Sequence, residues 1–98
     1  MADPKAMIHV SAASIWEISI KVRLARLDFA GDPVEEITAN GFFELPITAQ
    51  HAHVAGRLPR HHDDPFDRLL IAQAQLESLV LISHDAVFNS YDVSLLPI

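Results

Sequence analysis

Three acidic residues, Glu17, Asp67 and Asp85, have the chemistry and the placement that could support catalysis. Glu17 lies in the first turn of a predicted helix that follows a strand, and Asp67 lies at the start of another predicted helix. Asp85 comes two residues after a predicted strand. In parallel sheets, ligands bind beyond the carboxyl ends of the strands, so we expect Glu17 and Asp85, which follow strands, at that edge. Asp67 joins them only if the loop before its helix brings it there.

The chemistry that these carboxylates would support is metal-assisted phosphodiester hydrolysis. Carboxylates without neighbouring His or Cys select hard divalent cations such as Mg²⁺ or Mn²⁺. Such an ion lowers the pKa of bound water, orients a phosphodiester and stabilises the charge on the leaving oxygen. Ser83, at the end of a strand, could hydrogen-bond a bound water or a phosphate, although a Ser at this position is more often a cap.

Each acid also has a purely structural explanation. Glu17 would complete an S-x-x-E capping box with Ser14, Asp67 would be a first-turn acid favoured by the helix dipole, and Asp85 would cap a short turn. For any one of these acids taken singly, the structural explanation is the more common one. Only the convergence of all three distinguishes a catalytic site.

Basic and imidazole side chains gather between residues 57 and 68. We select Arg60, His62 and Arg68 as candidate contacts to the phosphates of a nucleic acid, because basic side chains commonly bind phosphate oxygens. Each of them alone is also explained as a solvated surface residue, and Arg68 is most readily explained as a structural one.

The histidines invite comparison with a zinc site. Their positions are His51, His53, His61 and His62. These spacings match no common zinc motif and no Cys joins them, so we expect solvated loop histidines.

The segment that organises the chain is 63–74, which reads D-D-P-F-D-R-L-L-I-A-Q-A. Asp64 can cap a helix, Pro65 suits the first helical position, and Asp67 then falls in the first turn. An apolar stripe that we expect to face the core recurs at Phe66, Leu69, Leu70 and Ala74.

The remaining elements alternate between strands and helices. We predict strands at 7–10, 43–47, 79–83 and 93–96, the third of them buried on both faces. We predict helices at 14–27, 34–40, 49–58 and 65–77 and a short turn at 86–89, with Trp16 in the core. This alternation predicts a three-layer α/β/α fold with a mainly parallel sheet.

Composition narrows the class of protein further. The 98 residues allow one domain, 1–98, and the absence of Cys excludes disulfides and thiolate metal sites. A formal net charge of −6 argues against general electrostatic binding of nucleic acid, so any contact with nucleic acid must be local. No apolar run approaches the ~20 residues of a membrane span and no signal peptide is apparent, so we expect a soluble, cytoplasmic protein without membrane contact.

Five stretches carry a resemblance to a known family: VSAASIWEISIK at 10–21, ELPIT at 44–48, AGRLP at 55–59, HDDPFDRLLIAQA at 62–74 and LISHD at 81–85. In this order they resemble the PIN-domain ribonucleases, specifically the VapC toxins of type II toxin–antitoxin systems. The resemblance implies an Mg²⁺- or Mn²⁺-dependent endoribonuclease, usually a homodimer, that a cognate VapB-type antitoxin inhibits by occupying the site. It makes Glu17, Asp67 and Asp85 the second, third and fourth acids of the family and places Ser83 at its Ser/Thr position.

The sequence departs from this family at its start. The opening βα unit of the family, whose strand ends in the first catalytic aspartate, has no counterpart here. We therefore expect an N-terminally truncated PIN-like domain that lacks one metal ligand. Two alternatives stay open beside a ribonuclease: a non-catalytic PIN remnant, and a binding module that engages the antitoxin through the apolar helix 14–27.

Overall fold

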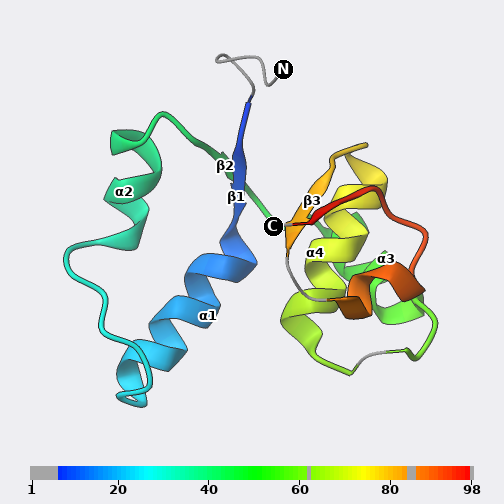
Figure 1. Cartoon of the computed structure of the whole chain (residues 1–98), viewed down its shortest axis with the longest axis horizontal. Helices are drawn as coiled ribbons and strands as arrows, with labels where there is room; N and C mark the ends of the chain where they lie inside the picture. Colours follow the sequence, from blue (N-terminus) through cyan, green and yellow to red (C-terminus); the bar gives the residue numbers. More distant parts are fainter. Residues whose placement is uncertain (1–6, 62, 84–85, 98) are drawn as a thin grey trace. The chain divides into compact units, whose positions relative to one another are not determined.

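The computed structural model describes residues 7–61, 63–83 and 86–97. The elements alternate between strands and helices (Figure 1). Their bounds are β1 His9–Ser11, α1 Ala12–Arg23, α2 Pro33–Ala39, β2 Phe43–Leu45, α3 Ala49–Arg57, α4 Pro65–Leu76, β3 Leu81–Ser83, the 3₁₀ helix η1 Ala86–Ser90 and β4 Leu95–Pro97. The chain folds as two compact units, Met1–Pro46 and Ile47–Ile98.

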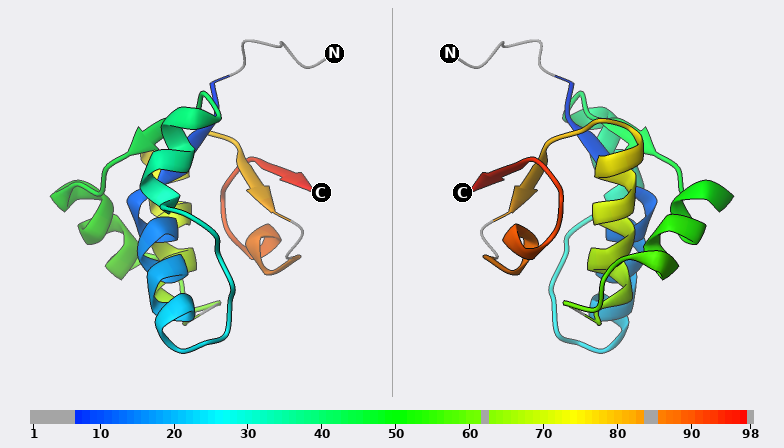
Figure 2. Two further views of the ribbon diagram at one scale, coloured as in Figure 1. Left: turned by 90° about the vertical axis from the view of Figure 1, so that its left-hand side faces the viewer. Right: turned by 90° about the vertical axis from the view of Figure 1, so that its right-hand side faces the viewer.

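Parallel strand pairs form the sheet of each unit. In the first unit β1 pairs with β2 in the register His9↔Phe43, and helices α1 and α2 connect the two strands. In the second unit β3 pairs with β4 in the register Ile82↔Leu96, and η1 lies in the connection between them (Figure 2). Parallel neighbours need such crossover connections, so the predicted α/β class with parallel strands is confirmed.

The prediction that strand 79–83 is buried on both faces is wrong. Its regular part is only β3, and the Ile82 side chain is 49% exposed. Leu81 packs against the core cluster of the second unit, which consists of Leu58, Ile71, Phe88 and Tyr91. Alternate residues of a strand point to opposite faces, so Leu81 faces this cluster and Ile82 faces away from it.

Helix α4 buries a different set of residues from the predicted stripe. Ala74 is buried as expected, but Ile71, Ala72 and Gln73 are buried with it, whereas Phe66, Leu69 and Leu70 are only half-buried. Four consecutive buried residues cover the whole circumference of a helix. This pattern arises because α4 packs against both α3 and β3.

Helix α1 begins earlier than predicted. Its N-cap is Ser11, whose Oγ accepts a hydrogen bond from the Ala13 amide at 3.0 Å, so Ser14 lies inside the helix. The predicted capping box of Ser14 and Glu17 is therefore wrong. Ser11 acts as the cap because the chain passes directly from the extended backbone of β1 into the helix. The core position predicted for Trp16 is also wrong, because its side chain is 59% exposed.

Helix α1 also ends earlier, at Arg23 instead of residue 27. Ala25 adopts a left-handed backbone with φ 56°, the Ala25 amide donates to the Val22 carbonyl, and the Arg26 amide donates to the Lys21 carbonyl. These two bonds are the Schellman motif that terminates helices. Helix α2 ends in the same way, with Gly41 at the left-handed position, and its predicted end is confirmed.

Buried His51 contradicts the expectation of a solvated loop histidine. It lies in the first turn of α3 and is 2% exposed. Its Nδ1 accepts a hydrogen bond from the Thr48 amide at 3.0 Å, and its Nε2 lies 2.9 Å from Glu77 Oε2. The amide of His51 in turn donates to the Thr48 hydroxyl, so the predicted Thr48 cap is confirmed. The imidazole is buried because both ring nitrogens have partners there.

The left-handed alanine gives a prediction for stability. Ala25→Gly should raise the free energy of unfolding by about 1 kcal/mol, because glycine adopts positive φ without the steric cost of a Cβ. Gly41→Ala is the matched control and should lower it by about 1 kcal/mol, since a Cβ at Gly41 meets no atom within 4 Å and only the backbone term remains. Urea unfolding measures both changes. An Ala25→Gly variant that is no more stable than the parent would contradict this description of the α1 terminus.

Candidate functional site

The start of α4 holds one of the predicted acids in a well-defined position. Asp64 is the N-cap, and its Oδ1 accepts hydrogen bonds from the Phe66 amide at 2.9 Å and from the Asp67 amide at 3.4 Å. Pro65 occupies the first helical position and Asp67 lies in the first turn. This confirms the predicted cap. Asp67 is therefore a half-buried carboxylate in the first turn of the helix, at the positive end of the helix dipole.

Arg68 fastens this helix start to the end of α3. Its Nη2 donates to the carbonyl groups of Ala55 and Leu58, both at 2.9 Å, and its Nη1 donates to the Pro59 carbonyl at 3.1 Å. The last carbonyl groups of a helix lack intrahelical partners, and a guanidinium can satisfy several of them at once. The structural role predicted for Arg68 is confirmed, while its contact with RNA stays a prediction.

The opposite ends of the same two helices are joined as well. His51 in the first turn of α3 contacts Glu77, which is the C-cap of α4. The side-chain Nε2 of Gln73 lies 3.4 Å from His51 Nδ1. The α3–α4 pair is thus bonded at both of its ends. Sequence reasoning missed this contact. The only local signal concerned the cap, because in Thr48-x-x-His51 the His takes the position where a capping box normally has Glu or Gln. Nothing in that pattern indicates Glu77 as its second partner.

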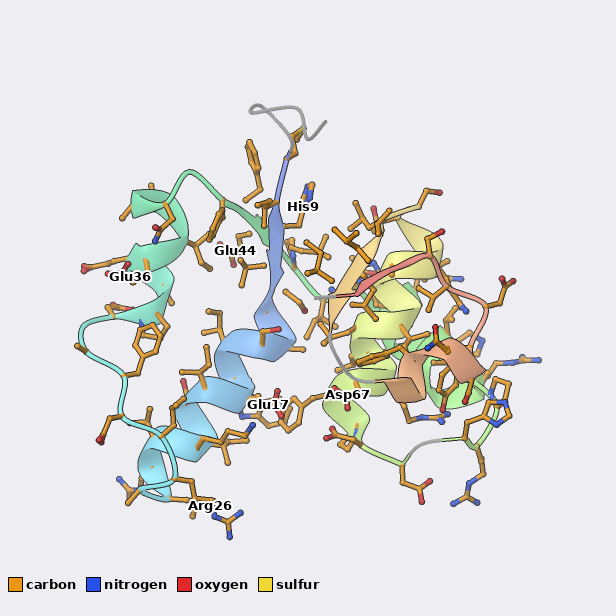
Figure 3. The ribbon with its side chains drawn as sticks, viewed as in Figure 1. His9, Glu17, Arg26, Glu36, Glu44 and Asp67 are labelled. Atoms are coloured by element: carbon orange, nitrogen blue, oxygen red, sulfur yellow. The ribbon has the colours of Figure 1, made fainter. Side chains whose placement is uncertain are left out.

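Glu17 lies on α1 in the first unit (Figure 3). Because the helix begins at Ala12, Glu17 falls in the second turn, and its Oε2 lies 3.5 Å from Lys21 Nζ one turn later. The first turn of α1 holds no acidic residue. The cap explanation for Glu17 is therefore excluded. Asp67, also labelled in Figure 3, belongs to the second unit, so the convergence of the two acids stays a prediction.

The structure describes only some of the other predicted site residues. Asp85 and His62 lie outside the described residues. Ser83 is the last residue of β3, opposite Pro97 in the strand register. The Arg60 side chain is 86% exposed and pairs with Asp63 at 3.7 Å, in the loop before α4. Such an exposed ion pair contributes little to stability, which leaves Arg60 accessible to an anionic ligand.

The residues present suit a hard divalent cation by their chemistry. Glu17 and Asp67 offer carboxylate oxygens, the ligands that Mg²⁺ and Mn²⁺ prefer. Within ranges 7–61, 63–83 and 86–97, no group of three His, Cys, Asp or Glu side chains is clustered closely enough to hold a metal ion. The three-acid site that we predict includes Asp85, which is outside these ranges.

Comparison with known proteins identifies the family. The family of PIN domains matches residues 1–94, nearly the whole chain, and the chain therefore belongs to the PIN domain family. This family implies nuclease-type activity, and its nucleases generally depend on a divalent metal ion. A search of curated proteins found no match. Among the described residues, no helix has the length and apolar character that crossing a bilayer requires.

The Arg68 contacts give a second prediction. Arg68→Ala should lower the free energy of unfolding by about 2 to 4 kcal/mol, because three carbonyl groups, two of them in partly buried hydrogen bonds, lose a charged donor. Arg57→Ala, at the exposed end of α3, is the matched control and should change stability by less than about 0.5 kcal/mol. Chemical denaturation of the two variants checks the difference. Equal stabilities would show that Arg68 does not fasten the start of α4.

Proposed function

We propose that this chain is a divalent-metal-dependent endoribonuclease of the VapC toxin type, acting on RNA phosphodiesters with Mg²⁺ or Mn²⁺. Membership of the PIN domain family supports the nuclease class. The single observation that carries the finer proposal is the start of α4, where the string D-P-F-D-R-L-L-I-A-Q-A forms a capped and fastened helix with Asp67 in its first turn.

In this proposal Glu17, Asp67 and Asp85 hold the metal ion. When bound, the ion supplies Lewis-acid stabilisation of the phosphate charge and a water of lowered pKa. The chain supplies the positioning. Asp64 and Arg68 hold the helix start on both sides of Asp67, so the backbone that carries this carboxylate does not have to be ordered when the ion binds.

The RNA contacts in this proposal are local, as the net charge of −6 requires. Arg60 and His62, in the loop before α4, and Arg68 would contact phosphates near the cleaved bond. Ser83 would hydrogen-bond a phosphate oxygen or the attacking water. Arg60 is available for such a contact because its side chain is 86% exposed.

A second candidate function is a non-catalytic PIN module that binds a VapB-type antitoxin. The observation that favours it is that four large apolar residues of α1 and the loop after it are exposed, namely Trp16, Val22, Leu24 and Leu27. Several exposed large apolar residues along one segment are typical of a protein interface. An antitoxin that covers this surface is compatible with either function, so binding alone does not separate the two.

RNA cleavage separates them. The purified chain should cut single-stranded RNA in Mg²⁺ or Mn²⁺ and stop when EDTA is added. Asp67→Asn keeps the side-chain shape but removes the charge, and it should lower the cleavage rate at least about 100-fold, consistent with loss of about 3 kcal/mol of transition-state stabilisation. Gel analysis of a labelled RNA measures the rate.

The matched control for this assay is Asp28→Asn, which makes the same chemical change at an exposed loop position of the first unit. It should leave the rate unchanged. Cleavage that survives Asp67→Asn would contradict the site assignment. A folded chain that cuts no RNA in either metal, while still binding the antitoxin, would favour the non-catalytic module.

A further inference from the structure

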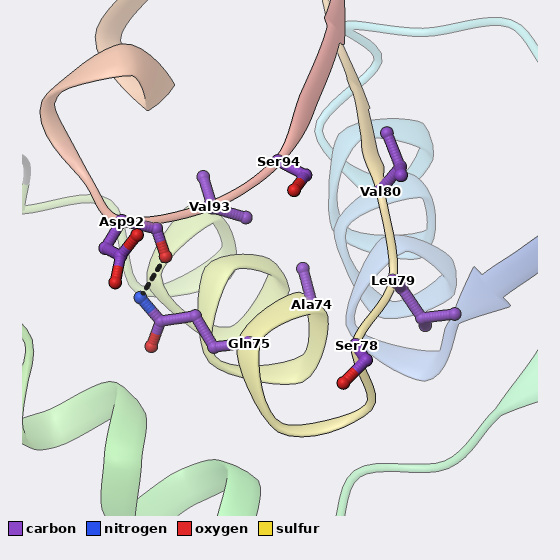
Figure 4. Close-up of a pocket in the computed structure, with 8 residues that line it drawn as sticks. All are labelled: Ala74, Gln75, Ser78, Leu79, Val80, Asp92, Val93 and Ser94. Carbon is purple, nitrogen blue, oxygen red and sulfur yellow. Dashed lines mark hydrogen bonds between the residues drawn. The ribbon is translucent and has the colours of Figure 1, made fainter.

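A cavity of about 490 Å³ lies in the second unit, at the C-terminal end of α4. It is formed by the end of α4, the chain entering β3 and the chain entering β4. Figure 4 shows Gln75 and Asp92 at one end of the lining residues and Ser78 and Leu79 at the other. The candidate nuclease site uses none of these residues.

The polar side chains in this cavity have unused hydrogen-bonding capacity. Within the described ranges, the Asp92 carboxylate and the hydroxyl groups of Ser78 and Ser94 make no hydrogen bond or ion pair to the protein. The backbone of Asp92 is held in place, because its carbonyl accepts a hydrogen bond from Gln75 Nε2 at 2.8 Å (Figure 4), while its side chain is exposed. An exposed carboxylate with free lone pairs is an acceptor for a ligand that brings donors.

The electrostatic character of the cavity is negative. Its lining contains one carboxylate and no Lys, Arg or His. Ser78 adopts a left-handed backbone with φ 55° directly after α4, and the Leu79 amide donates to the Ala74 carbonyl at 2.9 Å. This turn ends the helix at the cavity, where the last carbonyl groups carry the partial negative charge of the dipole.

We propose that this cavity binds a cation carried on a short aliphatic stem, a guanidinium or an ammonium group. The Asp92 carboxylate would accept the hydrogen bonds of the cationic group, and the hydroxyl groups of Ser94 and Ser78, further along the lining, would accept donors elsewhere on the ligand. The aliphatic side chains of Leu79, Val80 and Val93 would cover the stem. The stems of lysine and arginine lie along apolar protein surface in the same way. The group could belong to a free small molecule or to an Arg or Lys side chain of a peptide.

An NMR titration of the full chain tests this proposal with two probes. Agmatine represents the free cation and N-acetyl-arginine amide represents the peptide side chain. Saturable shifts are expected at the backbone amides of Ser78, Leu79, Val93 and Ser94, with a dissociation constant on the order of 1 to 10 mM for ligands of this size. A tighter constant for the arginine amide would identify a peptide as the source, and a tighter one for agmatine a free cation.

Two controls test whether binding depends on the charge of the ligand and of Asp92. N-acetyl-citrulline amide has nearly the same shape as the arginine probe without its charge, and it should bind at least about fivefold more weakly. Asp92→Asn should weaken both cationic probes about fivefold, whereas Asp28→Asn in the other unit should not. The proposal is overturned by equal shifts with the citrulline probe, by shifts that survive Asp92→Asn in a folded variant, or by the lack of a saturable shift for either cation. None of these outcomes depends on whether the chain cleaves RNA.

Discussion

The structure of the second unit depends on the bonding of helices α3 and α4 at both of their ends. Arg68 donates to three carbonyl groups around the end of α3, and His51 at its start contacts Glu77 at the end of α4. The apolar cluster around Ile71 holds this unit together, but apolar contacts have little directionality. The hydrogen bonds fix how far one helix can slide along the other, and thus where the first turn of α4, with Asp67, is placed.

Features that depend on local sequence could be predicted. The predictions of the caps Thr48 and Asp64 and of the helix end at Gly41 are confirmed, because each rests on residues within one turn. The predicted start and end of α1 are wrong. A Ser-x-x-Glu pattern exists at Ser14, but the strand that precedes the helix made Ser11 the cap, and an alanine took the left-handed position that usually requires glycine. Tertiary context overrode the local signal at both ends.

The candidate site was only partly predictable for the same reason. The sequence predicts Asp67 in a capped first turn because Asp64, Pro65 and Asp67 are neighbours. The burial of His51 could not be predicted, since its partner Glu77 is 26 residues away. Local sequence likewise cannot predict whether Glu17 and Asp67 come together, because the two acids belong to different units of the chain. Membership of the PIN domain family supplies the reason to expect it.

The shared metal site is tested most directly by a titration with Mn²⁺ without RNA, because this paramagnetic ion broadens the NMR signals of nuclei near it. If Glu17, Asp67 and Asp85 hold one ion, the amides around all three broaden together at substoichiometric Mn²⁺, with one common dissociation constant, and excess Mg²⁺ reverses the effect. Broadening around only one of the three acids, or separate constants for each, would contradict a shared metal site.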